Sequence, residues 1–209
     1  MGSRVNKPGQ ERVVVSAKLT TPQSSGAAAN WVWEFPANLR LTYAGQARAG
    51  VFSAADNAAK AADDLQEQMM EALLGDTPEA FLLSVQRGFE PRFLGDSFVV
   101  AGRTGFGSRV DLFEQGLPVT TRNKPGMSVK HFAFDSGSGL LARVQYSRPM
   151  GRELVPVTTE LAQYAMVGGA MMPRLILQRV RKQETFRLEV GNALWGPRVA
   201  DGMFSAEGK

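Results

Sequence analysis

The sequence predicts an α+β fold: one long, curved antiparallel sheet with two helices held on one of its faces. Short strand-like runs fill most of the 209 residues, and tight turns such as Ser-Gly-Ser-Gly and Arg-Pro-Met-Gly join them. Connections this short favour antiparallel pairing, because a parallel pair needs a crossover of about a dozen residues or more. Helical spacing is concentrated in a block near the first third of the chain. That block is therefore predicted to be an insertion in the sheet.

The N-terminal part is predicted to contain a tail and two strands. Residues 1–10 are expected to be disordered, and the run ERVVVSAKLTTP then has the pattern of a strand. In the next strand, WVWEFP, the rings of Trp31, Trp33 and Phe35 project to the same side, because strand side chains alternate. Three rings on one side are costly to leave in water, so they must pack against the helices or beneath another element.

Two helices follow. The first is predicted over Ser53–Leu74, because Ser53 with Asp56 can cap it and apolar residues recur at helical spacing up to Leu73. Gly75 is expected to end it. The second is predicted over Pro78–Arg87, with Thr77 as its cap and Gly88 after its end. Its apolar residues cover most of its circumference, which predicts burial against more than one neighbour.

The run FDSGSGLLARVQY could be a phosphate-binding loop or a hairpin turn. A phosphate loop opens a helix, but the residues after the glycines have a strand pattern, and no Gly-Lys-Ser/Thr follows. Upstream, His131 and Ala133 are predicted to share one face, with Phe132 and Phe134 on the other. The pattern therefore favours a β-hairpin, in which glycine supplies the positive φ of the turn.

The composition limits the chemistry. The net charge is +4 and the charges are spread along the chain, so a nucleic-acid partner is not indicated. The densest basic run, QRVRKQETFR, has the pattern of a solvated hairpin end, with phosphate or anionic-lipid contact as the alternative. The chain has no cysteine, no apolar run of transmembrane length and no visible signal peptide.

No catalytic or metal site is predicted, and no cofactor. His131 is the only histidine, so the Gly95–Phe98 run GDSF, which resembles a hydrolase nucleophile block, lacks a base on a later loop for Ser97. With one histidine and no cysteine, a transition-metal site would need carboxylates alone, and none cluster suitably. We therefore expect a protein that is not an enzyme.

Four segments, in their order and spacing, match the pattern of a known family. These are WVWEFPANLRLTYAG (31–45), LLGDTPEAFL (73–82), FDSGSGLLARV (134–144), and LAQYAMVGGAMMPRLI (161–176) with TFRLEVGN (185–192) and GMF (202–204). Together they resemble the LolA/LppX/RseB superfamily of bacterial envelope proteins, in particular its outer membrane lipoprotein-sorting protein-like branch, and the resemblance spans nearly the whole chain.

The resemblance implies an unclosed β-barrel with a two-helix lid over its concave face, and residues 11–209 as one such domain. It also implies an apolar cavity between sheet and lid that receives acyl chains of lipids or lipoproteins. The chain would then be a monomeric carrier that is periplasmic or otherwise exported in a bacterium, with an envelope protein as a possible partner. The alternative is a lipid-sensing or scaffold module of the same fold, without transfer activity. The residues expected to line the cavity are Trp31, Trp33, Phe35, Leu65, Met69, Leu73, Phe81, Leu82, Phe132, Phe134 and Met166.

The methionines and one departure from the family pattern bear on this reading. Met69 and Met166, with Met70, Met171 and Met172, suit a deformable cavity, although the same residues could simply fill a core. In lipoprotein carriers of this superfamily a basic residue precedes the proline of the tryptophan strand. Here that position is Phe35, and Arg40 lies several residues away. The resemblance therefore supports the fold more strongly than lipoprotein transfer.

Overall fold

The computed structural model describes residues 12–34, 38–51, 64–100, 107–121, 124–150, 153–167 and 170–196. The predicted tail at residues 1–10 lies outside these ranges, as do Phe35 and Pro36. Two helices and thirteen strands occur in the described part: β1 Arg12–Thr20, β2 Ser25–Glu34, β3 Asn38–Tyr43, β4 Gln46–Val51, α1 Leu65–Gly75, α2 Pro78–Gln86, β5 Arg92–Val100, β6 Gly107–Thr121, β7 Lys124–Asp135, β8 Leu141–Met150, β9 Glu153–Ala162, β10 Ala165–Val167, β11 Ala170–Met172, β12 Leu175–Val180 and β13 Gln183–Gly196.

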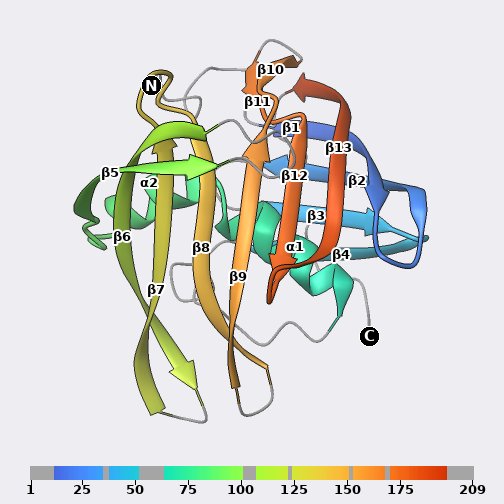
Figure 1. Ribbon diagram of the computed structural model, residues 1–209. Helices are drawn as coiled ribbons and strands as arrows, with labels where there is room; N and C mark the ends of the chain where they lie inside the picture. The colour runs from blue at the N-terminus through green and yellow to red at the C-terminus, as the bar shows by residue number, and fades with distance from the viewer. Residues whose placement is uncertain are drawn as a thin grey trace.

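Eleven of the described strands form one sheet in the order β4-β3-β2-β1-β13-β12-β9-β8-β7-β6-β5. Each neighbouring pair in it is antiparallel. Figure 1 shows the sheet twisting from the upright strands β6–β9 on the left to the horizontal strands β2–β4 on the right. Its two edges, β4 and β5, do not pair with each other in this order. The predicted α+β fold, an unclosed curved sheet with two helices, is confirmed.

The strand order explains why the helices cover a face of the sheet. The chain leaves the sheet at one edge strand, β4, and re-enters it at the opposite edge strand, β5. The segment between them contains both helices, so it must travel from one edge to the other. Figure 1 shows α1 and α2 lying against the same side of the sheet along this path. This helix pair is the lid.

Helix α1 begins later than the sequence analysis predicted. Asp64 has an extended backbone, with φ −129° and ψ 165°, and its carboxylate accepts a hydrogen bond from the Glu67 N–H at 2.8 Å. Asp64 is therefore the N-cap, and a continuous helix from Ser53 is excluded. Arg48 of β4 fixes this cap with a 2.6 Å ion pair to Asp64. Residues 52–63, including the expected Ser53 and Asp56 cap, lie outside the described ranges.

The turn between the helices is shorter than expected. Gly75 is the last residue of α1, and Asp76 is its C-cap, with its N–H donating to the Ala72 carbonyl. The prediction that Gly75 lies beyond the helix end was therefore wrong by one residue. Thr77 caps α2 as predicted, since its Oγ1 accepts from the Ala80 N–H at 3.1 Å. With Asp76 and Thr77 as adjacent caps, the two helices meet at a tight corner.

The end of α2 and the predicted hairpin agree with the sequence analysis. Gly88 follows α2 with φ +89°, and the Phe89 N–H donates back to the Ser84 carbonyl at 3.0 Å. The run 134–146 forms the β7–β8 hairpin, in which Gly139 has φ +67°. Its turn is held by the Asp135 carboxylate, which accepts from the N–H and the hydroxyl of Ser138 at 2.7 Å each. These bonds lower the pKa of Asp135 below its ordinary value.

The basic run also forms a hairpin turn. Arg181 and Lys182 join β12 to β13 with φ values of +51° and +69°, the sign that a two-residue hairpin turn needs at both positions. Arg181 pairs with Glu153, and Arg187 pairs with Glu184 at 2.9 Å. The expected solvated hairpin end is therefore present, with three of its basic residues, Arg179 among them, engaged in ion pairs.

The run from Glu153 to Val167 forms two strands, β9 and β10. It divides at Gln163, which has φ +55°, and the following Tyr164 donates its hydroxyl hydrogen to the Leu141 carbonyl at 2.7 Å. Strand β10 then pairs with β11 in a separate two-stranded sheet. Met166 and Met171 lie on this small hairpin, outside the main sheet.

Candidate functional site

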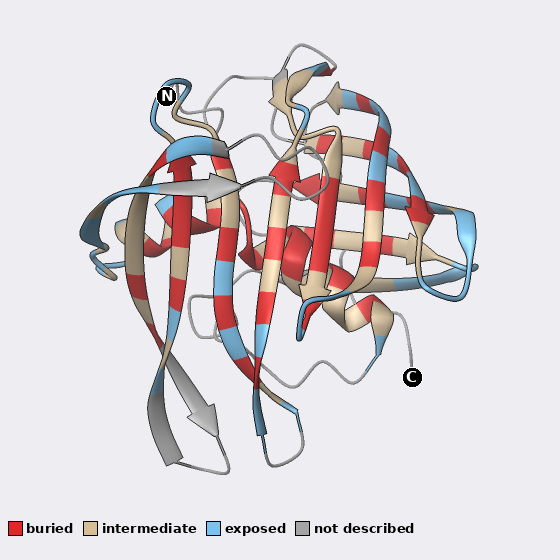
Figure 2. Cartoon of the chain, viewed as in Figure 1, coloured by how far each residue is buried: buried red, intermediate tan, exposed pale blue. Residues whose placement is uncertain are grey.

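The layer between lid and sheet contains two apolar clusters. The first lies mainly over β1, β2, β3, β12 and β13 and includes the inner side of α1. Strand alternation produces it, and Figure 2 shows buried and exposed positions alternating along the strands. On β1, Val13, Val15 and Leu19 are fully buried, while Ser16 and Lys18 are exposed. The first cluster consists of Val13, Val15, Ala17, Leu19, Ala29, Trp31, Trp33, Leu39, Leu41, Met69, Ala72, Leu73, Val167, Ile176, Phe186, Leu188, Val190 and Ala193.

The second cluster lies over β7, β8 and β9 and is centred on Phe81 of α2. The Phe81 ring packs against Phe132 and Phe134 of β7, with centroid distances of 5.0 and 5.2 Å, and against Phe113 of β6 at 5.8 Å. These tilted and edge-to-face contacts are geometries that aromatic pairs prefer. The second cluster consists of Phe81, Phe132, Phe134, Leu141, Val144, Tyr146, Val155, Val157, Leu161 and Val180.

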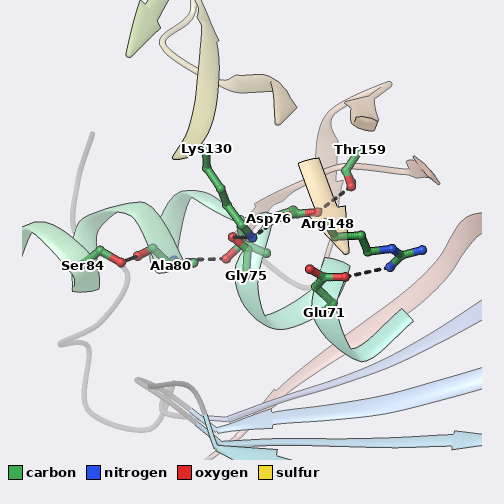
Figure 3. Close-up of polar contacts among 9 residues, drawn as sticks. Glu71, Gly75, Asp76, Ala80, Ser84, Lys130, Arg148 and Thr159 are labelled. Atoms are coloured by element: carbon green, nitrogen blue, oxygen red, sulfur yellow. Dashed lines mark hydrogen bonds and ion pairs between the residues drawn. The ribbon is translucent and has the colours of Figure 1, made fainter. Parts of the chain in front are cut away.

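A buried polar group connects the lid to the sheet at the corner between the helices (Figure 3). Asp76 pairs with Lys130 of β7 at 2.8 Å, and its other oxygen accepts from the Thr159 hydroxyl of β9 at 2.6 Å. One turn earlier on α1, Glu71 pairs with Arg148 of β8 at 2.9 Å. We call Glu71, Asp76, Lys130, Arg148 and Thr159 the hinge cluster.

The hinge cluster balances two acids with two bases in the interior of the protein. Lys130, Asp76 and Arg148 are each 0% exposed. The Lys130 ammonium also lies 4.4 Å from the centre of the Tyr146 ring, a cation–π contact. Buried charges are tolerated only when paired, so each ion pair depends on the lid being closed. The cluster therefore holds the lid against the middle of the sheet.

Burial shifts the titration of two groups here. The pKa of Glu71 is raised, mainly because burial disfavours its charged form and secondarily by the nearby Asp76 carboxylate, while Lys130 and Arg148 oppose the rise. The pKa of Tyr146 is raised well above its ordinary value, first by burial and then by Asp76 and Glu71. Tyr146 is therefore neutral, and Glu71 binds a proton more readily than an ordinary glutamate does.

Arg148 has donors that the protein does not use. Its Nη1 reaches Glu71, but within the described part of the chain its Nε and Nη2 have no hydrogen-bond partner. Gln178 of β12 is also fully buried, with neither side-chain amide atom partnered among the described residues. It lies opposite Thr159 in the β9–β12 register. Buried polar groups normally have partners, so both residues call for an explanation.

The residues expected to line an apolar cavity divide between the clusters. Four are buried in the first cluster, and Leu65 packs against it; three are buried in the second cluster. Two are exposed: Leu82, 41% exposed on α2, and Met166, 63% exposed on β10. Phe35 lies outside the described residues. The buried four are Trp31, Trp33, Met69 and Leu73, and the buried three are Phe81, Phe132 and Phe134.

The hinge cluster was not predicted from the sequence, although strand alternation contained part of its signal. Lys130 has the same parity as Phe132 and Phe134 on β7, and Arg148 has the same parity as Val144 and Tyr146 on β8. Alternation alone would have placed both bases on the inner face. Their acidic partners lie 54 and 77 residues away in the sequence, so the pairing itself could not be read from local pattern.

The residues considered for catalysis do not come together. Ser97 is exposed on β5 opposite Val110, whereas the Nε2 atom of His131 lies 3.2 Å from the Glu114 carboxylate on the neighbouring strand. Among the described residues, no group of three or more histidine, aspartate or glutamate side chains is arranged to hold a metal ion. Neither helix of the described part is long and apolar enough to cross a membrane.

Comparison of the sequence with known proteins finds no matching family model and no matching curated protein. Comparison of the fold finds several solved structures. One is named as an outer membrane lipoprotein-sorting protein domain, from Vibrio parahaemolyticus; it has a TM-score of 0.54 and 10% identity, over 93% of this chain and 89% of that chain.

Two further structures are similar to the same extent. A LolA superfamily protein from Nitrosomonas europaea has a TM-score of 0.53 and 10% identity, over 96% of this chain and 91% of that one. A DUF1329 family protein from Desulfovibrio piger has a TM-score of 0.54 and 9% identity, over 94% and 90%. The similarity extends over nearly the whole of each chain. This protein has a LolA-like fold.

Proposed function

From the LolA-like fold, we propose that this protein is a non-enzymatic carrier of the bacterial envelope that binds acyl chains of lipids or lipoproteins between sheet and lid. The observation that carries the proposal is the first cluster. Two tryptophans of β2 and the apolar side of α1 meet there across the sheet–lid interface. Apolar sites with a few polar groups are the usual form of a lipid site.

The chemistry of the first cluster suits a site that opens for a ligand. Met69 is fully buried, and Met70 and Met172 pack at its margin. Methionine adapts to irregular apolar shapes, so the cluster can repack around an acyl chain without a fixed empty space. Residues 11–209 would form this one domain. Export to the periplasm and a monomeric state are part of the same proposal.

A scaffold or lipid-sensing module of the same fold is the second candidate. The hinge cluster favours it, because two fully buried ion-paired bases hold the lid closed. In a module of this kind, side chains would fill the layer between sheet and lid in which a carrier binds lipid.

Lipid extraction distinguishes the two candidates. A carrier purified without detergent from its native host should retain lipid that mass spectrometry detects after solvent extraction. After delipidation it should rebind oleate in a saturable way, with a shift or quench of tryptophan emission. Absence of bound lipid together with absence of oleate binding would contradict the carrier proposal and favour the scaffold.

A tryptophan variant localises the binding. In a Trp195→Phe background, emission comes from Trp31 and Trp33, both buried in the first cluster. Adding Trp33→Ala should weaken oleate binding while circular dichroism shows a folded chain. As a control, Leu194→Ala removes an exposed side chain of β13 and should leave affinity unchanged. Unchanged affinity in Trp33→Ala would place the ligand elsewhere.

The non-enzymatic part of the proposal has its own test. Ser97→Ala should leave any background hydrolysis of a short-chain ester unaltered in rigorously purified protein, because His131 is engaged with Glu114 and not with Ser97. Loss of hydrolysis in that variant would make Ser97 a nucleophile.

A further inference from the structure

Arg148 presents one edge of its guanidinium group without a protein partner. Its Nη1 donates to Glu71 at 2.9 Å, which uses one side of the group. Nε and Nη2 form the adjacent edge, and within the described residues neither donates to the protein. These two N–H groups point in parallel, which is the geometry that binds the two oxygens of a carboxylate or phosphate side by side.

This free edge is fully buried, which makes it unusual. Arg148 is 0% exposed, so bulk water does not reach these donors as it would at a surface. Leaving charged donors unsatisfied in the interior costs more free energy than leaving neutral ones unsatisfied. Such a group is kept where something else satisfies it, either ordered water or a ligand.

Its position fits a ligand that enters under the lid. Arg148 lies on β8 and is tied to α1 through Glu71, so it sits at the boundary between lid and sheet (Figure 3). Its neighbours on the same face of β8, Val144 and Tyr146, belong to the second cluster. An acyl chain in the layer between sheet and lid could therefore have a polar end at Arg148.

We propose that the free Nε–Nη2 edge of Arg148 binds the acidic head group of the amphiphile carried under the lid. This inference rests on the proposed carrier function and narrows its ligand class to single-headed lipids ending in a carboxylate or phosphate. In this arrangement Glu71 binds Nη1 of Arg148, and the oxygens of the ligand accept hydrogen bonds from Nε and Nη2.

The test compares two ligands of equal chain length, oleate and oleyl alcohol, by tryptophan emission on delipidated protein at about pH 8, where the carboxylate is ionised in water. Wild-type protein should prefer oleate by about 10- to 100-fold, the range expected for a charge-assisted pair of hydrogen bonds. Oleyl phosphate should bind as oleate does. Acetate and inorganic phosphate alone should not displace either lipid at millimolar concentration.

Three variants separate recognition from structure. Arg148→Lys keeps the positive charge but lacks the two parallel N–H donors of the guanidinium group, so it should lose most of the preference for oleate. Glu71→Gln/Arg148→Met removes both members of the pair, which avoids a lone buried carboxylate, and should bind the two lipids equally. Arg109→Met removes an exposed arginine of β6 and should retain the preference, which makes it the matched control.

The outcomes separate this inference from the carrier function. Equal binding of oleate and oleyl alcohol by wild type, or an unchanged preference in the double variant and in Arg148→Lys, would overturn the head-group role and leave the carrier proposal standing. Displacement of oleate by acetate or phosphate alone would make the edge a small-anion site and would also overturn it. Binding of neither lipid by wild type would contradict the carrier function itself.

Discussion

The two apolar clusters under the lid differ in how their side chains interlock. In the second cluster Phe81 packs against three phenylalanine rings, with centroid distances from 5.0 to 5.8 Å. The first cluster has a different composition. It combines two tryptophans with methionine, aliphatic residues and alanines of β1, β2 and β13.

The difference in packing indicates that the two helices have different roles. Interlocked rings have few alternative arrangements, so the second cluster should anchor α2 to the sheet. Methionine and small residues repack at lower cost, so the first cluster is where we expect the lid to yield to a ligand. The hinge cluster lies between them, at the corner where α1 meets α2.

The largest expected effect comes from breaking the hinge cluster. Asp76→Asn keeps the shape of the side chain but leaves the Lys130 ammonium buried without its counter-charge. We expect a loss of about 3–5 kcal/mol in the free energy of unfolding, measured by urea denaturation. Asp76→Asn/Lys130→Met should recover part of that loss. A loss below about 1 kcal/mol in the single variant would show that the pair is not buried in solution.

The second prediction compares how one substitution in each cluster affects stability and lipid affinity. Phe81→Ala should cost about 3 kcal/mol of stability, because it removes the centre of the ring cluster. Met69→Leu, a change of similar volume in the first cluster, should cost less than about 1.5 kcal/mol but alter lipid affinity. Denaturation and oleate titration of both variants provide the comparison. Equal effects on stability, with affinity altered only in Phe81→Ala, would reverse the assignment of the two clusters.

Gln178 provides a smaller test of the inner face. Its buried amide has no partner among the described residues, and such a group lowers stability by about 1–3 kcal/mol. Gln178→Met should therefore raise the unfolding free energy of delipidated protein by about 1 kcal/mol. As a control, Gln145→Met changes an exposed residue of β8 and should change it little. A fall in stability in Gln178→Met would show that the amide is satisfied, for instance by ordered water.

The smallest expected effect is a pH dependence. Burial raises the pKa of Glu71 above its ordinary value of 4.5, so the folded chain holds this proton more tightly than the unfolded chain. Its contribution to stability is complete below pH 4.5 and is lost as pH rises through the raised folded value. Glu71→Gln should remove that part of the slope in denaturation curves measured across this range. An identical slope in the variant would assign it to another group.

Much of the fold was predictable because its signals are local. The alternation of apolar and polar residues predicted the strands. Gly88 and Gly139 indicated the end of α2 and the β7–β8 turn. The start of α1 was predicted wrongly because the N-cap is Asp64. Arg48 stabilises this cap through an ion pair, and the two residues are distant in the sequence. The break between β9 and β10 has no clear local signal, because the residue there that adopts a positive φ, Gln163, is not a glycine.

The candidate site was less predictable, for a physical reason. Local pattern identifies which residues face inward, as it did for Trp31 and Phe132, but it does not show what they meet across the interface. Asp76 and Thr159 are 83 residues apart and are joined only by the fold. The hinge cluster is built from the corner between two helices and from three strands, so no spacing of residues in the sequence predicts it.

Photo-crosslinking most directly tests whether acyl chains bind between sheet and lid. A fatty acid carrying a diazirine near the middle of its chain is bound to delipidated protein and irradiated, and the labelled residues are mapped by mass spectrometry. Saturable labelling of Met69, Leu73 or Trp33, competed by oleate, is the predicted result. Labelling confined to exposed residues such as Leu154 and Leu194, or labelling that oleate does not compete, would contradict it.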